Sequence, residues 1–71
     1  MYNIKDILTL SDNNKYIVIN KLNYNNTTYY MLLDYYDDNI WFIMYEDGKF
    51  LKIEEDEETL YYVLKNFNVD I

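Results

Sequence analysis

The side chains of this sequence that could take part in chemistry are carboxylates, and they gather beside predicted turns. They fall at Asp34, Asp37, Asp38, Glu46, Asp47 and the unbroken run Glu54, Glu55, Asp56, Glu57 and Glu58. Two carboxylates can hydrolyse a glycosidic bond, but such a pair needs a shaped pocket and opposed environments. Histidine and cysteine are absent, so the usual general base and every thiol nucleophile are missing. We therefore expect a protein that is not an enzyme, with no catalytic residue and no cofactor.

Metal binding is the second chemistry that acidic residues suggest. A calcium loop places its oxygen ligands at alternating positions and closes with a glutamate. Neither the segment 34–38 nor Glu46-Asp47-Gly48 has that spacing. The run from Glu54 to Glu58 has two interpretations: a stripe that binds a metal or a partner, or the first turn of a helix, where carboxylates favour the positive end of the dipole. We predict no metal site.

The charge balance narrows the class of partner. Thirteen acids against six lysines give a net charge of −7. Direct binding to nucleic acid or to an anionic membrane needs clustered positive charge, so we expect neither. Carboxylates spaced along a folded surface can instead imitate a phosphate backbone, and a nucleic-acid-binding protein would accept such a decoy. The acidic residues above are therefore candidate contacts for a protein partner with a basic surface.

Tyrosine is the other unusual feature, with ten copies in the chain. Tyrosine is enriched in recognition surfaces because it offers a large contact area with a polar tip. The aromatic candidates for partner binding are Tyr29, Tyr35, Trp41 and Tyr45. Ordinary core filling or the codon bias of an AT-rich genome could equally account for the tyrosine excess. A homodimer through the aromatic residues is a further expectation.

Turn signals divide the chain into short segments, as in an antiparallel meander. They are Ser11 to Asn14, Asn25-Asn26, Asp37 to Asn39 and Asp47-Gly48, and we predict a type I′ hairpin turn at Asp47-Gly48. β-branched and aromatic residues fill the intervals and predict strands at residues 7–9, 16–23, 27–36, 40–46 and 49–53.

After Ile53 the apolar period changes to that of a helix. Leu60, Val63, Leu64 and Phe67 are spaced three and four apart and share one helical face. Asp56 is the predicted N-cap, and the helix is predicted from about Asp56 to Phe67. The fold class that follows is α+β: an antiparallel meander of four to five strands with one C-terminal helix packed on a face. Residues 1–71 form a single domain, since the chain is short and has no linker composition.

The third and fourth predicted strands are apolar on both faces. Tyr30 and Leu32 alternate with Tyr29, Met31 and Leu33, and neighbouring side chains of a strand point to opposite faces. One set should meet the helix. The other set is then left to solvent, to the N-terminal segment or to another molecule.

The longest apolar stretch is far shorter than a bilayer span of roughly 20 residues. The first six residues also lack the basic start and apolar run of a secretory signal. We expect a cytoplasmic protein.

Two resemblances add to this interpretation. The segment from Tyr16 to Leu32, together with Glu46-Asp47-Gly48 and the strand that follows, resembles the bacterial family called domain of unknown function twelve-ninety-two. The resemblance implies a strand pair, a Glu-Asp-Gly hairpin and a short acidic helix, and it implies no activity. This chain departs from the family in having no glycine at its second turn. In composition alone, the chain is similar to phage-encoded inhibitors of bacterial defence, including anti-CRISPR proteins.

These observations together predict a small acidic, non-enzymatic inhibitor that binds a nucleic-acid-handling defence enzyme in place of its nucleic acid. The alternative is a structural or regulatory adaptor of the host cell that acts through an aromatic homodimer or docking face. Salt dependence separates the two, because contacts between charges weaken with salt and apolar contacts do not.

Overall fold

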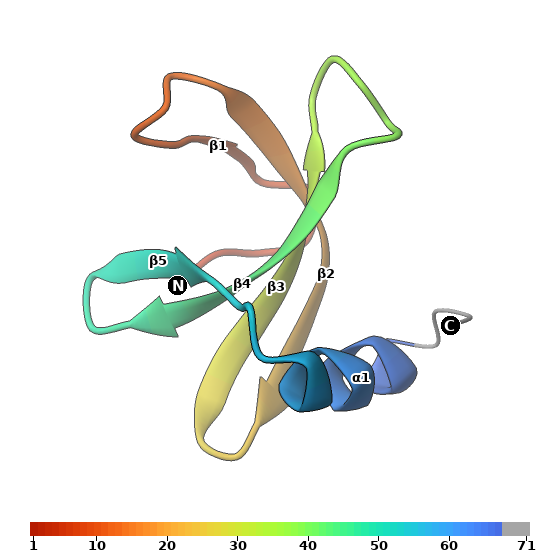
Figure 1. Ribbon diagram of the computed structural model, residues 1–71. Helices are drawn as coiled ribbons and strands as arrows, with labels where there is room; N and C mark the ends of the chain where they lie inside the picture. Colours follow the sequence, from red (N-terminus) through yellow and green to blue (C-terminus); the bar gives the residue numbers. More distant parts are fainter. Residues whose placement is uncertain (68–71) are drawn as a thin grey trace.

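The computed structural model describes residues 1–67. They form a curled antiparallel sheet followed by a helix (Figure 1). The elements are β1 (Ile7–Thr9), β2 (Lys15–Tyr24), β3 (Thr27–Asp34), β4 (Trp41–Asp47), β5 (Phe50–Ile53) and α1 (Glu57–Asn66). The strands lie in the order β1-β2-β3-β4-β5, so each strand pairs with its neighbours in sequence. The predicted five-stranded meander, the C-terminal helix and the α+β class are confirmed.

The β2–β3 turn has the geometry that a tight hairpin requires. Tyr24 pairs with Thr27, which leaves Asn25 and Asn26 as the two turn residues, with φ values of 53° and 62°. Positive φ at both central positions defines a type I′ turn. Asparagine tolerates this left-handed conformation better than most residues, so the predicted turn is found where the two asparagines stand.

The predicted type I′ turn at Asp47-Gly48 is wrong by one residue. Asp47 is the last residue of β4 and pairs with Phe50, so the turn residues are Gly48 and Lys49. Gly48 has a φ of 62°, and within residues 1–67 Lys49 is not among the residues with positive φ. Positive φ at the first central position alone is the pattern of a type II′ turn. The single glycine is placed at the position where that turn needs it.

A β-bulge bends the second strand. The register between β2 and β3 shifts between Val18 and Asn20, which leaves Ile19 as the extra residue. Bulges increase the local right-handed twist of a sheet. Figure 1 shows the outcome: β1 and β5 curl away from the plane of the central strands and lie on the same side as the N-terminus.

The two faces of the sheet carry separate clusters of buried apolar residues. The first core cluster contains Tyr29, Met31, Ile43, Val63, Leu64 and Phe67. Its members come from β3, β4 and the helical segment, and Leu60 packs against them. The stripe predicted for the helix therefore contributes to this cluster in full.

The second core cluster lies on the opposite face and contains Tyr16, Val18, Tyr30, Leu32 and Met44. Apolar side chains from outside the central strands pack against it, including Tyr2, Leu8, Leu10 and Leu51. Of the three alternatives for this face (solvent, the N-terminal segment or another molecule), the structure shows the N-terminal segment. The curled edge strands, which were not among the alternatives, add to this cover. The alternating apolar residues of β3 are thus buried on both sides.

The helix begins and ends close to the predicted residues. Asp56 is the N-cap, and its carboxylate accepts hydrogen bonds from the backbone N–H of Thr59 at 2.9 Å and from the Thr59 hydroxyl at 2.8 Å. These hydrogen bonds, the one to the hydroxyl above all, lower the pKa of Asp56. Phe67 is the C-cap, and Lys65 lies in the last turn, where a cation suits the negative end of the dipole.

Candidate partner-binding surfaces

The acidic β3–β4 loop uses most of its carboxylates to hold its own shape. Asp34 accepts hydrogen bonds from the backbone N–H groups of Tyr36 at 2.8 Å and Asp37 at 3.1 Å. Asp37 accepts from the backbone N–H of Asn39 at 3.0 Å. Asp38 is exposed and has no hydrogen-bond or ion-pair partner within residues 1–67. Of the three carboxylates singled out in this loop, Asp38 is the one left for another molecule.

The acidic run before and inside α1 likewise contains carboxylates with hydrogen-bond partners in the chain and carboxylates without them. Glu54 accepts a hydrogen bond from the Tyr29 hydroxyl at 3.4 Å and from the backbone N–H of Asp56 at 3.3 Å, and Asp56 caps the helix. The remaining three are exposed and without a partner in the described part of the chain. We call this set the α1 carboxylates: Glu55, Glu57 and Glu58.

Two further candidates lie at the end of β4, and both already have partners. Glu46 accepts a hydrogen bond from the Tyr30 hydroxyl. Asp47 forms an ion pair with Lys52, with 2.7 Å between Oδ2 and Nζ, and both side chains are about half exposed. The hydrogen bond and charge of Asp47 raise the pKa of Lys52. Neither carboxylate is therefore left without a partner, and Asp47 alone has its charge compensated by a lysine.

The two sets of available carboxylates lie at opposite ends of the sheet. The β3–β4 loop closes one end, whereas α1 lies near the β2–β3 turn at the other end (Figure 1). Glu54 lies beside the middle of β4, because its backbone N–H donates to the carbonyl of Ile43. The Asp37-Asp38 turn and the Glu54 run therefore do not share one sheet end, because β5 ends at Ile53 and the chain then leads away from the loop to α1.

The four aromatic candidates separate by exposure. Tyr29 is 7% exposed and belongs to the first core cluster, and burial, followed by the charge of Glu54, raises its pKa. Tyr45 is half-buried and packs against the same cluster. Tyr35 is 50% exposed and Trp41 44% exposed. Only the last two present much of their rings to solvent in this structure.

Sequence reasoning missed Asp12, which lies in the β1–β2 turn at the same sheet end as Asp34. Its carboxylate accepts from the backbone N–H of Asn14 at 2.9 Å and from the Tyr16 hydroxyl at 2.9 Å. The hydrogen bond from the Asn14 backbone, then that from Tyr16, lowers the pKa of Asp12. The signal was present, because Asp12 precedes two asparagines in a predicted turn and aspartate favours such positions.

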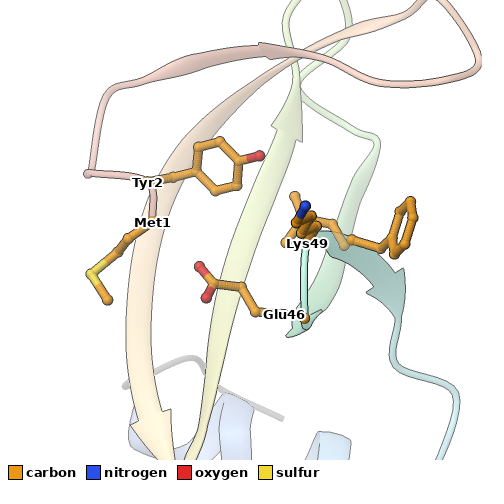
Figure 2. Close-up of a pocket in the computed structure, with 7 residues that line it drawn as sticks. Met1, Tyr2, Glu46 and Lys49 are labelled. Carbon is orange, nitrogen blue, oxygen red and sulfur yellow. The ribbon is translucent and has the colours of Figure 1, made fainter.

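A surface hollow lies between the N-terminal segment and the β4–β5 hairpin (Figure 2). It has a volume of about 340 Å³ and is lined by Met1, Tyr2, Glu46 and residues 48–51. Figure 2 shows the Glu46 carboxylate directed toward the N-terminal segment. Of the acidic side chains in the described part of the chain, Glu46 alone lines this hollow, so it offers no opposed pair of carboxylates for acid–base hydrolysis.

A buried tyrosine joins two of the residues that line this hollow, Tyr2 and Glu46. Tyr30 is fully buried, its hydroxyl accepts a hydrogen bond from the backbone N–H of Tyr2 at 3.2 Å, and it donates to Glu46. Burial first, and then the hydrogen bond to Glu46, raises the pKa of Tyr30 to about 12. The Tyr2 and Tyr30 rings also meet edge to face, with centroids 5.6 Å apart. This network fastens the N-terminal segment to the sheet.

Comparisons with protein-family models, with curated proteins and with solved structures gave no match. The resemblances to the domain of unknown function twelve-ninety-two and to defence inhibitors therefore stay predictions. Within residues 1–67, no group of acidic side chains is arranged to hold a metal ion. The same residues include no helix with the length and apolar character needed to cross a bilayer.

Proposed function

We propose that this chain is a small acidic, non-enzymatic protein that binds a basic surface on a nucleic-acid-binding enzyme and blocks it, as a defence inhibitor would. The observation that carries the proposal is the uncompensated negative charge. The chain has a net charge of −7, and within residues 1–67 a single ion pair joins a lysine to a carboxylate. Such a charge attracts a cationic cleft and speeds association with it.

The α1 carboxylates are the proposed centre of this contact. They are exposed, they follow one another within four positions, and no lysine lies between Ile53 and Leu60. The proposal takes α1 as packed on one face of the sheet, which its share of the first core cluster supports. Because the apolar stripe then points inward, the α1 carboxylates are free to meet cations of the enzyme.

Asp38 supports a second point of contact at the far end of the sheet. The protein measures 29 × 28 × 20 Å along its principal axes, so its two anionic ends are separated by much of its length. A groove that normally holds a nucleic acid presents cations along its whole course. We therefore propose that an elongated basic groove, rather than a single cationic pocket, is the surface that this protein covers.

A competition experiment tests this function. Purified nucleic-acid-binding defence enzymes, including a CRISPR effector nuclease, are incubated with labelled nucleic acid, and its displacement by the protein is measured at low and high salt. We expect displacement that weakens as salt rises, since screening reduces charge–charge attraction. Displacement that is unchanged between low and high salt, or no displacement from any enzyme in the set, contradicts the proposal.

Two matched variants locate the contact. Glu55→Gln/Glu57→Gln/Glu58→Gln removes three charges from side chains that have no partner in the described chain. We expect it to weaken competition by at least about tenfold, as loss of complementary charge slows association. Replacing the same three residues by aspartate keeps the charge and should leave competition close to that of the natural chain. Equal competition by both variants would overturn the placement at α1.

An aromatic docking or homodimer face is the second candidate function. The exposure of Tyr35 and Trp41 supports it. A contact of this kind is predominantly apolar, and it should persist in high salt, where the contact proposed above is lost.

A further inference from the structure

A row of four apolar residues crosses the sheet on the face that carries the first core cluster. The pairs in register are Ile7 with Ile17, Ile17 with Leu33, and Leu33 with Trp41, so the row runs from β1 to β4 without a break. Alternation along β3 and β4 places Leu33 on the same face as Met31, and Trp41 on the same face as Ile43. We call these four residues the apolar row.

The described part of the chain does not cover the apolar row. None of its four members belongs to either core cluster or is among the half-buried residues packed against one. Ile7 is 53% and Trp41 44% exposed, and Ile17 and Leu33 between them are half-buried. The helix contributes to the cluster that contains Tyr29, Met31 and Ile43, which is the part of this face nearer the β2–β3 turn (Figure 1).

The two ends of the row carry opposite charges. Lys15 pairs with Thr9 and stands two residues before Ile17, so it lies on the same face at the β1–β2 side of the row. Asp37 and Asp38 lie in the loop that leads into Trp41, at the β4 side. All three charged side chains are exposed. A surface with a cation at one end and anions at the other is complementary to a copy of itself turned through 180°.

We propose that the apolar row is the contact surface of a homodimer. The two copies pack face to face about a two-fold axis parallel to the strands. This arrangement sets Ile7 of each copy against Trp41 of the other, and Lys15 of each copy against Asp38 of the other. This contact specifies the surface of the homodimer that is the second candidate function above. It does not depend on the inhibitory contact, because the row lies away from the α1 carboxylates, although Asp38 belongs to both surfaces.

The physical chemistry of this contact predicts a weak dimer that salt strengthens. Four residues and their surroundings give an interface at the low end of the size range, below about 1,200 Å² in total. Two copies each carry a net charge of −7, so they repel one another, and screening of that repulsion favours association. This salt dependence is opposite to that of the proposed inhibitory contact, which salt weakens.

Sedimentation equilibrium of the natural chain from about 10 μM to 1 mM, in low and in high salt, tests the proposal. We expect a monomer–dimer equilibrium with more dimer in high salt. Trp41 is the only tryptophan, so its fluorescence should shift to shorter wavelength over the same concentration range. A monomer at every concentration, or a dimer that forms with no change in tryptophan emission, overturns the proposal without any variant.

Substitutions then locate the interface. Ile7→Lys and Trp41→Lys should each raise the dimer dissociation constant by at least about tenfold, because each places a charge in an apolar contact. Phe50→Lys is the matched control: Phe50 is 70% exposed, lies on β5 away from the row, and receives the same change in charge. Circular dichroism confirms that each variant is folded. Loss of the dimer in Phe50→Lys, with the other two unaffected, would contradict the proposal.

A charge exchange tests the orientation of the two copies. Lys15→Asp and Asp38→Lys should each weaken the dimer, because each sets like charges against one another across the axis. The double variant restores the complementary pairs and should recover the affinity of the natural chain. If either single substitution weakened the dimer only by disturbing the fold, the second substitution would not restore the affinity. Failure of the double variant to recover affinity therefore overturns the two-fold arrangement.

Discussion

Single residues show how this chain employs its carboxylates. Asp12, Asp34, Asp37 and Asp56 each accept a hydrogen bond from a backbone N–H two or three residues further along the chain. This local acceptor role is the reason that aspartate favours turns and helix N-caps. The sequence predicts such positions well. It does not reveal which carboxylate is left free, because that depends on distances of a few ångströms within each turn.

Tyr30 should be the tyrosine on which stability depends most strongly. Tyr30→Phe removes the donor to Glu46 and the acceptor of the Tyr2 N–H, and leaves two polar groups unpaired. We expect the free energy of unfolding, measured by urea denaturation, to fall by about 1–3 kcal/mol. Tyr36→Phe is the control, since Tyr36 is 77% exposed, and it should change little. Equal stability of the two variants would contradict the role given to the Tyr30 hydroxyl.

The same residue predicts a pH dependence at the alkaline end. Folding raises the pKa of Tyr30 from 10.0 to about 12, so the folded state favours the neutral phenol. The stabilisation is complete below pH 10 and is lost as the pH rises toward 12, by about 2–3 kcal/mol in total. Urea denaturation at pH 9 and pH 11 should show a larger fall for the natural chain than for Tyr30→Phe. If the free energy of unfolding fell equally in both proteins, the loss of stability would come from the titration of other tyrosines, and the prediction for Tyr30 would be wrong.

At the scale of elements, turn chemistry and apolar periodicity predicted the strands and the helix to within two residues at each end. These signals are local, and local signals suffice when every strand pairs with its neighbour in sequence. The Gly48 turn differed by one residue because a single glycine fits a type II′ turn better than a type I′ turn. The sequence left two features open: the bulge at Ile19 was not predicted, and the N-terminal cover of the second core cluster was one of three alternatives. Both arise from contacts distant in sequence, which no local pattern encodes.

The candidate site was predicted less well than the fold, for the same reason. The acidic and aromatic residues were found at the turns and strands expected of them. Burial of Tyr29 and the pairing of Asp47 with Lys52 depend on how the elements meet. The apolar row in particular is visible only once the register of four strands is known.

The β4–β5 turn offers a test at this scale. Gly48→Ala forces a residue with a Cβ into a φ of 62°, although the added atom would meet nothing within 4 Å. We expect a loss of about 1 kcal/mol in the free energy of unfolding, from backbone strain alone. Asn26→Gly should be neutral or slightly stabilising, because Asn26 has the same positive φ. Thermal denaturation should therefore show a lower melting temperature for Gly48→Ala and an equal or higher one for Asn26→Gly. A higher melting temperature for Gly48→Ala would contradict the turn assignment.

The whole molecule is small and strongly anionic, and it has a cluster of buried apolar side chains on each face of its one sheet. Its charge is nearly uncompensated, because one ion pair joins Asp47 and Lys52 within residues 1–67 while the net charge is −7. Self-repulsion of this kind destabilises a compact state. The charge that is proposed to attract a basic enzyme therefore lowers the stability of the protein that carries it.

Added salt should accordingly stabilise the protein. We expect the melting temperature, followed by circular dichroism at a concentration too low for dimers, to rise between about 0.02 M and 0.5 M sodium chloride, because screening shortens the reach of repulsion. The variant Glu55→Gln/Glu57→Gln/Glu58→Gln carries less charge and should show a smaller rise. A melting temperature that falls with salt would mean that attractive pairs outweigh repulsion.

The strict neighbour-to-neighbour order of the strands has a consequence for how the protein is made. Each hairpin can close as soon as its second strand has left the ribosome, since no strand waits for a distant one. The helix joins last and completes the first core cluster. Paired strands that are close in sequence also favour rapid folding. Newly made chains should therefore expose their unpaired strand edges only briefly during translation.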